Sequence, residues 1–174
     1  MNDSAQRSDT HTIYLGLGSN LGDRDAHLRA ALEALPPEVK LTRVSSVYDT
    51  EPMHVTEQPR FHNIVCAAIT TLAPPDLLRY LKRIEDELGR TPGERFGPRV
   101  IDLDILFYDQ IVVCESDLVI PHPRLANRQF VLAPLAEIAP FLRHPLLDVT
   151  IGELHERGPN ADVRKLGVLS DPTA

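Results

Sequence analysis

The order of its strand-like and helix-like segments is the feature of this sequence that most constrains its fold. Four short runs rich in apolar or β-branched residues have the composition of strands: 12–18, 40–50, 61–71 and 100–109. Two other segments, 23–35 and 75–89, place apolar residues at helical spacing. The resulting order, β-α-β-β-α-β, predicts an α+β fold with a split βαβ, or ferredoxin-like, core.

The remainder of the chain predicts additional elements around this core. We expect one or two short strands within 110–120, a helix over 130–140 that starts or kinks at Pro134, and a helix over 150–157. Helices of the core are expected on one face of an antiparallel sheet. Because the extra C-terminal helices can cover the other face, the whole chain is predicted to form α/β/α layers.

Charge and hydropathy limit the functions that such a domain could have. Lys and Arg total 18 against 25 Asp and Glu, a formal net charge of -7, which disfavours nucleic acid or an anionic membrane as partner. No apolar run is long enough to span a membrane, and the polar residues 1–10 lack the apolar region of a signal peptide. We expect a cytoplasmic protein with a disordered tail over 1–10 and a single domain over 11–174. Cys66 and Cys114 lie in strand-like runs and are predicted to be buried thiols.

Asp102 and Asp104 are the strongest candidates for metal ligands in this sequence. Because side chains alternate along a strand, both carboxylates share one face while Ile101, Leu103 and Ile105 take the other. Positions two apart on one face are separated by about 6.5 Å, so the carboxylates can hold one Mg²⁺ or straddle two. The alternative is a solvated acidic pair, because Asp-x-Asp also arises by chance in an acidic chain.

Cationic residues flank the aspartate pair in the sequence: Arg90, Arg95, Arg99, His122, Arg124 and Arg128. Arginine forks and histidine donors suit phosphate oxygens, whereas any single arginine could instead form an ordinary surface ion pair. His122 lies between two prolines, which restrict its backbone. Carboxylates, Mg²⁺ and arginines together are the components of a phosphoryl-transfer site, which favours a polyphosphate ligand.

Three further residues suggest a planar ligand. Phe61 and Phe130 lie at the starts of a predicted strand and a predicted helix, where two facing aromatics could sandwich a heterocycle. The amide of Asn63 could donate to and accept from the edge of such a ring. The alternative is that both aromatic side chains belong to the hydrophobic core.

The glycine-rich stretch 16–22, "GLGSNLG", does not match a nucleotide-binding fingerprint. Its third glycine comes one residue late for the dinucleotide motif, and no Lys-Ser/Thr pair follows as in a P-loop. We instead expect Ser19 or Asn20 to cap the turn into the first helix.

Five stretches in this order resemble the 6-hydroxymethyl-7,8-dihydropterin pyrophosphokinases of folate biosynthesis: "GLGSNLGD", "YDTEP", "QPRFHNIV", "RFGPRVIDLDIL" and "PHPRLANRQFVLAPLAEIAP". The resemblance extends from Thr12 to Leu154. It implies transfer of the pyrophosphoryl group of ATP to the hydroxymethyl group of the pterin, release of AMP, two Mg²⁺ ions and action as a monomer.

The resemblance also implies roles for individual residues. Asp102 and Asp104 would bind both Mg²⁺ ions, and Glu85 would lie on the nucleotide side. The cations implied for the triphosphate and for catalysis are Arg90, Arg95, Arg99, His122 and Arg128. The pterin contacts that it implies are Thr50, Met53, Phe61, Asn63 and Phe130. The "GLGSN" stretch would form a mobile wall of the pterin site.

The chain departs from the family pattern in two loops. "MHVTEQP" over 53–59 replaces a Pro-x-Gly-like stretch, and "TPGE" over 91–94 lacks a further basic residue. Two other functions are compatible with the sequence. One is a Mg²⁺-dependent transferase acting on a sugar nucleotide, and the other is a non-catalytic ferredoxin-like module that binds a small ligand. The first accounts for the aspartates but not for the aromatic residues and Asn63.

Overall fold

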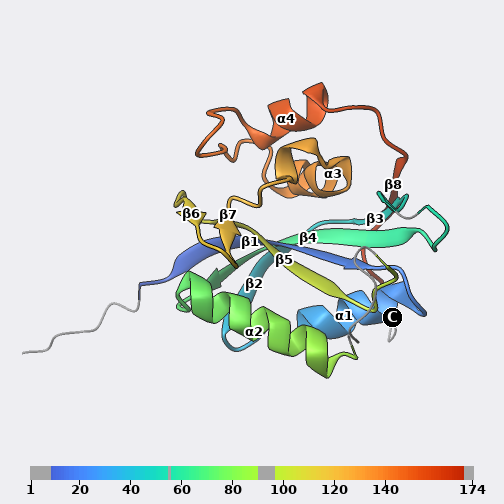
Figure 1. Cartoon of the computed structure of the whole chain (residues 1–174), viewed down its shortest axis with the longest axis horizontal. Coiled ribbons are helices and arrows are strands. Elements are labelled where there is room, and N and C mark those ends of the chain that lie inside the picture. Colours follow the sequence, from blue (N-terminus) through green and yellow to red (C-terminus); the bar gives the residue numbers. More distant parts are fainter. Residues whose placement is uncertain (1–8, 55, 90–96, 171–174) are drawn as a thin grey trace, which may run out of the picture.

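The computed structural model describes residues 9–54, 56–89 and 97–170, and it consists of three layers (Figure 1). Helices α1 (Arg24–Ala34) and α2 (Pro74–Glu87) cover one face of the sheet, while α3 (Gln129–Ile138) and α4 (Ile151–Arg157) lie on the other. The predicted α/β/α layering is therefore confirmed. The expected disordered tail falls almost wholly on residues 1–8, which lie outside the described residues.

The main sheet is antiparallel in every pairing of its described strands. Its order is β5-β1-β4-β3-β8, and β2 pairs with β4 beside β3. The strands are β1 (His11–Ser19), β2 (Val39–Val44), β3 (Val47–Thr50), β4 (Phe61–Thr70), β5 (Asp102–Tyr108) and β8 (Val163–Gly167). Without β8, this is the order of the predicted ferredoxin-like core.

Two apolar clusters hold the layers together. Leu15, Leu81 and Leu103 belong to the cluster beneath α1 and α2, and Phe107 and Leu132 belong to the one beneath α3 and α4. Since strand residues alternate, the neighbours of Leu103 in β5 face the α3 side of the sheet. No helix within the described residues is long and apolar enough to cross a membrane.

Several local expectations need correction. The run 40–50 is two strands, because Ser45 and Ser46 interrupt it, and the Ser45 hydroxyl accepts a hydrogen bond from Val65 N at 2.9 Å. The first helix is capped by Asp23, which accepts from Ala26 N at 3.0 Å, and not by Ser19 or Asn20.

The two cysteines differ in environment. Cys66 is a buried free thiol as predicted, and burial raises its pKa to about 12. Cys114 is exposed, contrary to expectation, because it lies in a two-residue strand of the small hairpin formed by β6 (Val113–Cys114) and β7 (Val119–Ile120). This hairpin confirms the two short strands expected in that region.

Candidate active site

An open pocket lies on the α3 side of the sheet, where the ends of β1 and β3 meet the starts of β4 and β5. Nine predicted site residues line it: Thr50, Met53, Phe61, Asn63, Arg99, Asp102, Asp104, Arg128 and Phe130. His122 and Glu85 are not among its lining residues, and Arg90 and Arg95 lie outside the described residues. The fold thus brings together residues that are up to 80 positions apart, as are Thr50 and Phe130.

The carboxylate pair stands on β5 opposite two glycines. In the register of β1 and β5, Gly16 pairs with Asp104 and Gly18 with Asp102, so β1 places no side chain between the carboxylates and the pocket. Asp102 and Asp104 are half-buried, whereas Leu103 between them is buried on the opposite face. No group of three or more His, Cys, Asp or Glu side chains among the described residues could hold a metal ion. A metal here would therefore rely on this pair and on oxygens of a ligand.

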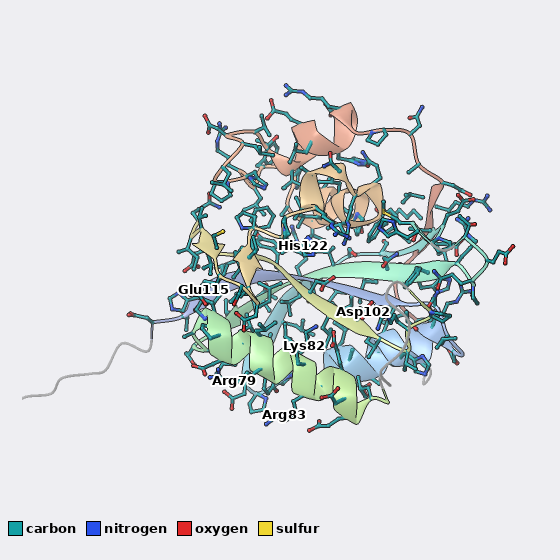
Figure 2. All side chains as sticks on the ribbon, viewed as in Figure 1. Arg79, Lys82, Arg83, Asp102, Glu115 and His122 are labelled. Carbon is teal, nitrogen blue, oxygen red and sulfur yellow. The ribbon has the colours of Figure 1, made fainter. Side chains whose placement is uncertain are left out.

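Glu85 lies behind the aspartates rather than in the pocket. Its fully buried carboxylate accepts a hydrogen bond from Leu103 N at 2.7 Å, and each of its oxygens lies 3.1 Å from Lys82 Nζ. Figure 2 shows Lys82 on α2, on the far side of the sheet from His122. Glu85 therefore anchors the outer edge of β5 between Asp102 and Asp104.

His122 is a neutral hydrogen-bond donor next to the cations. Burial, followed by the charges of Arg128 and Arg124, lowers its pKa to about 4. Its Nδ1 accepts from Arg124 N at 3.3 Å, which leaves the ring proton on Nε2. The His122 backbone N–H donates to Leu106 O at 3.0 Å and so ties this loop to β5.

Arg128 and Phe130 begin helix α3 and face the same pocket. The Arg128 guanidinium carbon lies 5.5 Å from the centre of the Phe130 ring, a cation–π arrangement that orients both groups. Burial lowers the pKa of Arg128, and the nearby Asp104 carboxylate opposes this shift. A cation and a carboxylate therefore meet on one side of the pocket.

The opposite wall carries Asn63 and Thr50. Asn63 is buried, and its Nδ2 donates to Thr50 Oγ1 at 2.7 Å. Its Oδ1 packs against Gly18, where a Cβ atom would come within 2.6 Å. Gly18 thus leaves room for the Asn63 amide, a steric reason for this glycine that the sequence alone does not reveal.

Asn20 joins three segments around the pocket and was missed as a site residue. Its side chain donates to Gln58 Oε1 at 3.0 Å and to Pro59 O at 3.1 Å, and it accepts from Arg99 N at 2.7 Å. Its backbone N–H donates to Arg99 O at 3.0 Å. Because this buried Asn has every side-chain group paired, it fixes the end of β1, which contains most of the "GLGSN" stretch, against both neighbouring segments. Gln58 itself lines the pocket.

Comparison with known proteins places these residues in a family. The model of the 7,8-dihydro-6-hydroxymethylpterin-pyrophosphokinase family matches residues 14–140. This range begins within the first predicted strand of the core, includes every later core element and ends with the helix expected over 130–140. The chain belongs to this family. The match spans the carboxylate pair, the cations of the pocket and the Asn63 wall.

Curated relatives in this pyrophosphokinase family agree with the match. The chain is 41% identical over 157 residues to the 2-amino-4-hydroxy-6-hydroxymethyldihydropteridine pyrophosphokinase of Bacillus subtilis, covering 89% of this chain and 92% of that protein. It is 38% identical to the folic acid synthesis protein FOL1 of Dictyostelium discoideum, covering 91% of this chain. The chain spans only 24% of the length of that longer relative.

Solved structures share the fold. The HPPK-DHPS of Plasmodium falciparum superposes with a TM-score of 0.73 at 17% sequence identity, over 88% of this chain and 46% of that one. At this identity the likeness concerns the fold alone. It agrees with the ferredoxin-like α+β architecture predicted from the order of elements.

Proposed function

We propose that this chain transfers the pyrophosphoryl group of ATP to the hydroxymethyl group of 6-hydroxymethyl-7,8-dihydropterin and releases AMP, in folate biosynthesis. The observation that carries the proposal is that one pocket combines a carboxylate pair and arginines with a wall of aromatic and amide side chains. Family membership supports the same reaction.

The amide and aromatic wall suits the pterin. Phe61 and Phe130 line the pocket and offer faces on which a bicyclic ring can stack. The Asn63 amide can exchange its hydrogen bond with Thr50 for bonds to the ring edge, since an amide both donates and accepts. Backbone groups near Thr50 and Met53 complete this proposed pterin subsite.

The carboxylate and arginine side suits the triphosphate and Mg²⁺. Magnesium is commonly bound by one or two carboxylates together with phosphate oxygens and water, so Asp102 and Asp104 fit two such ions despite the lack of a third described ligand. When bound, Mg²⁺ would neutralise phosphate charge and favour loss of the hydroxyl proton. Glu85, proposed for the nucleotide side, would act there through the β5 backbone that it holds.

The protein's own residues would orient the reactants. Arg99 and Arg128 would hold phosphate oxygens, with Arg90 and Arg95 proposed to close over them. Neutral His122 would donate from Nε2, because its pKa of about 4 keeps it uncharged near neutral pH. The hydroxymethyl oxygen of the pterin would attack the β-phosphorus of ATP and give up its proton to water. The bond between the β-phosphorus and the oxygen that bridges to the α-phosphate would break, and AMP would leave with that oxygen. Positioning and charge stabilisation would supply most of the rate.

Product analysis tests the proposal. The purified 174-residue chain is mixed with ATP, Mg²⁺ and the hydroxymethyl dihydropterin, and the nucleotides and pterins are separated. We expect AMP and pyrophosphorylated pterin in equal amounts, dependent on pterin and abolished by a chelator. ADP, or no nucleotide turnover by folded protein, would refute it. We also propose a monomer, as the resemblance to the family implies, and size-exclusion chromatography with light scattering checks this.

A further inference from the structure

A cluster of charged side chains lies behind the pterin wall, on the opposite face of the sheet. We call it the rear ion cluster, and its members are Arg24, Asp25, Asp49, Arg60, His62 and Asp162, with the exposed Glu51 at its margin, 3.4 Å from Arg60 Nη1. Because side chains alternate along β3 and β4, Asp49 and His62 point away from the face that carries Thr50 and Asn63. Arg24 and Asp25 of α1 meet them there.

Arg60 is the centre of the rear ion cluster and directly precedes Phe61. Its Nε donates to Asp49 Oδ2 at 2.6 Å and its Nη1 to Asp162 Oδ2 at 2.9 Å. Its Nη2 lies within hydrogen-bond distance of the backbone oxygens of the same two residues, 3.3 Å from Asp49 O and 3.4 Å from Asp162 O. The guanidinium therefore binds the end of β3 and the start of β8 at once, immediately beside a pocket residue.

The backbone carries this anchoring to the pocket. Thr50 pairs with Phe61 on one side and with Val163 of β8 on the other, so each partner follows a residue of the rear ion cluster. Arg24 Nη1 also donates to Arg60 O at 2.8 Å, which fixes the peptide between Arg60 and Phe61. Figure 1 shows β8 beside β3 at the edge of the sheet. This strand lies beyond the family match, which ends at residue 140.

We propose that Asp162 is a positioning residue for the pterin subsite. Through Arg60 it holds β8 against β3 and β4 and keeps Thr50, Phe61 and Asn63 in register for the pterin. The metal side of the pocket, on β5, is separated from β3 and β8 by β1 and β4 in the order of the sheet. This inference rests on the proposed function only in naming the ligand as the pterin.

The test compares Asp162→Ala with Arg164→Ala. Arg164 binds the same carboxylate, 2.9 Å from Nε to Asp162 Oδ1, but its side chain is 67% exposed and does not contact Arg60 in any described interaction. Asp162→Ala should raise KM for the pterin about ten-fold, the effect of losing one charge-assisted hydrogen bond, with KM for ATP changed less than about two-fold. Arg164→Ala should leave both constants near wild type. A merely structural role would instead lower the active fraction, and hence kcat, without raising KM for the pterin more than KM for ATP.

A second measurement does not depend on activity. Amide hydrogen exchange should accelerate in β3 and at the start of β4 in Asp162→Ala and in the isosteric Asp162→Asn, with β5 as the internal reference. Unchanged exchange there would overturn the anchoring. Equal pterin KM values in Asp162→Ala and Arg164→Ala, with an active wild type, would overturn the positioning role. If the wild type forms no AMP, the proposed function fails, and the exchange result alone decides the anchoring.

Discussion

Replacing Gly18 by alanine should impair pterin binding without unfolding the protein. The new Cβ would lie 2.6 Å from Asn63 Oδ1, whereas carbon–oxygen contacts normally begin near 3.3 Å, so the amide must move by about 0.7 Å. Asn63 can turn away as a side-chain end, which limits the loss of unfolding free energy to its hydrogen bond with Thr50, about 0.5–1.5 kcal/mol. The displaced amide can no longer read the ring edge in its original position.

The expected kinetic effect is specific to the pterin. A loss of about 1.4 kcal/mol corresponds to ten-fold weaker binding, so KM for the pterin should rise by roughly that factor. Gly16→Ala is the matched control for pterin affinity alone, because the nearest contact of its Cβ would be Leu106 at an ordinary 3.5 Å and Gly16 pairs with Asp104 on the metal side of the pocket. The assays are pterin titration by calorimetry and steady-state AMP formation. Wild-type pterin affinity in Gly18→Ala, or equal impairment in Gly16→Ala, would refute the steric reasoning.

Three other changes test the rest of the pocket. Asp104→Asn should lower AMP formation by about a hundred-fold or more, because it removes charge from the site where cations would bind, while thermal unfolding stays near wild type; near-normal turnover would contradict this. Asn20→Asp should cost about 2–4 kcal/mol in urea unfolding, because a buried carboxylate would face Gln58 Oε1 and the Pro59 carbonyl; a stable variant would argue against that network. His122 has a folded pKa of about 4, below its ordinary 6.5, so the folded protein binds fewer protons between these values. Unfolding free energy should therefore fall as pH drops from 6.5 to 4, by at most about 3 kcal/mol, and His122→Gln should remove that part of the slope.

Much of the fold followed from local patterns. The alternation of apolar and acidic residues in 101–105 predicted that Asp102 and Asp104 share one face of β5, because that pattern depends only on strand geometry. The order of elements predicted the sheet, since short connections leave few topologies available. Because that topology brings the ends of β1 and β3 next to the starts of β4 and β5, nine of the residues suggested by motif and resemblance line one pocket.

What the sequence did not predict depends on contacts between distant segments. Asn20 was expected to cap a helix, but its partners Gln58 and Arg99 lie 38 and 79 positions away. β8 escaped prediction because its five residues include Arg164 and Lys165 and lack an apolar alternation, as is common in an edge strand. Its place is set by pairing with β3 and by the Arg60 contacts, which no local pattern encodes.

The position of Gly18 between two strands fixes a distance within the pocket. In the sheet this glycine is the direct neighbour of Asn63 on one side and of Asp102 on the other. Two strand spacings, about 9.6 Å in all, therefore separate the backbone that carries the amide from the backbone that carries the first carboxylate. Hydrogen bonds of β1 to both strands maintain this distance. Loop movements can therefore change access to the pocket but not the distance between the two backbones. In the proposed reaction, the sheet itself would select substrates by how far the reacting oxygen lies from the ring edge.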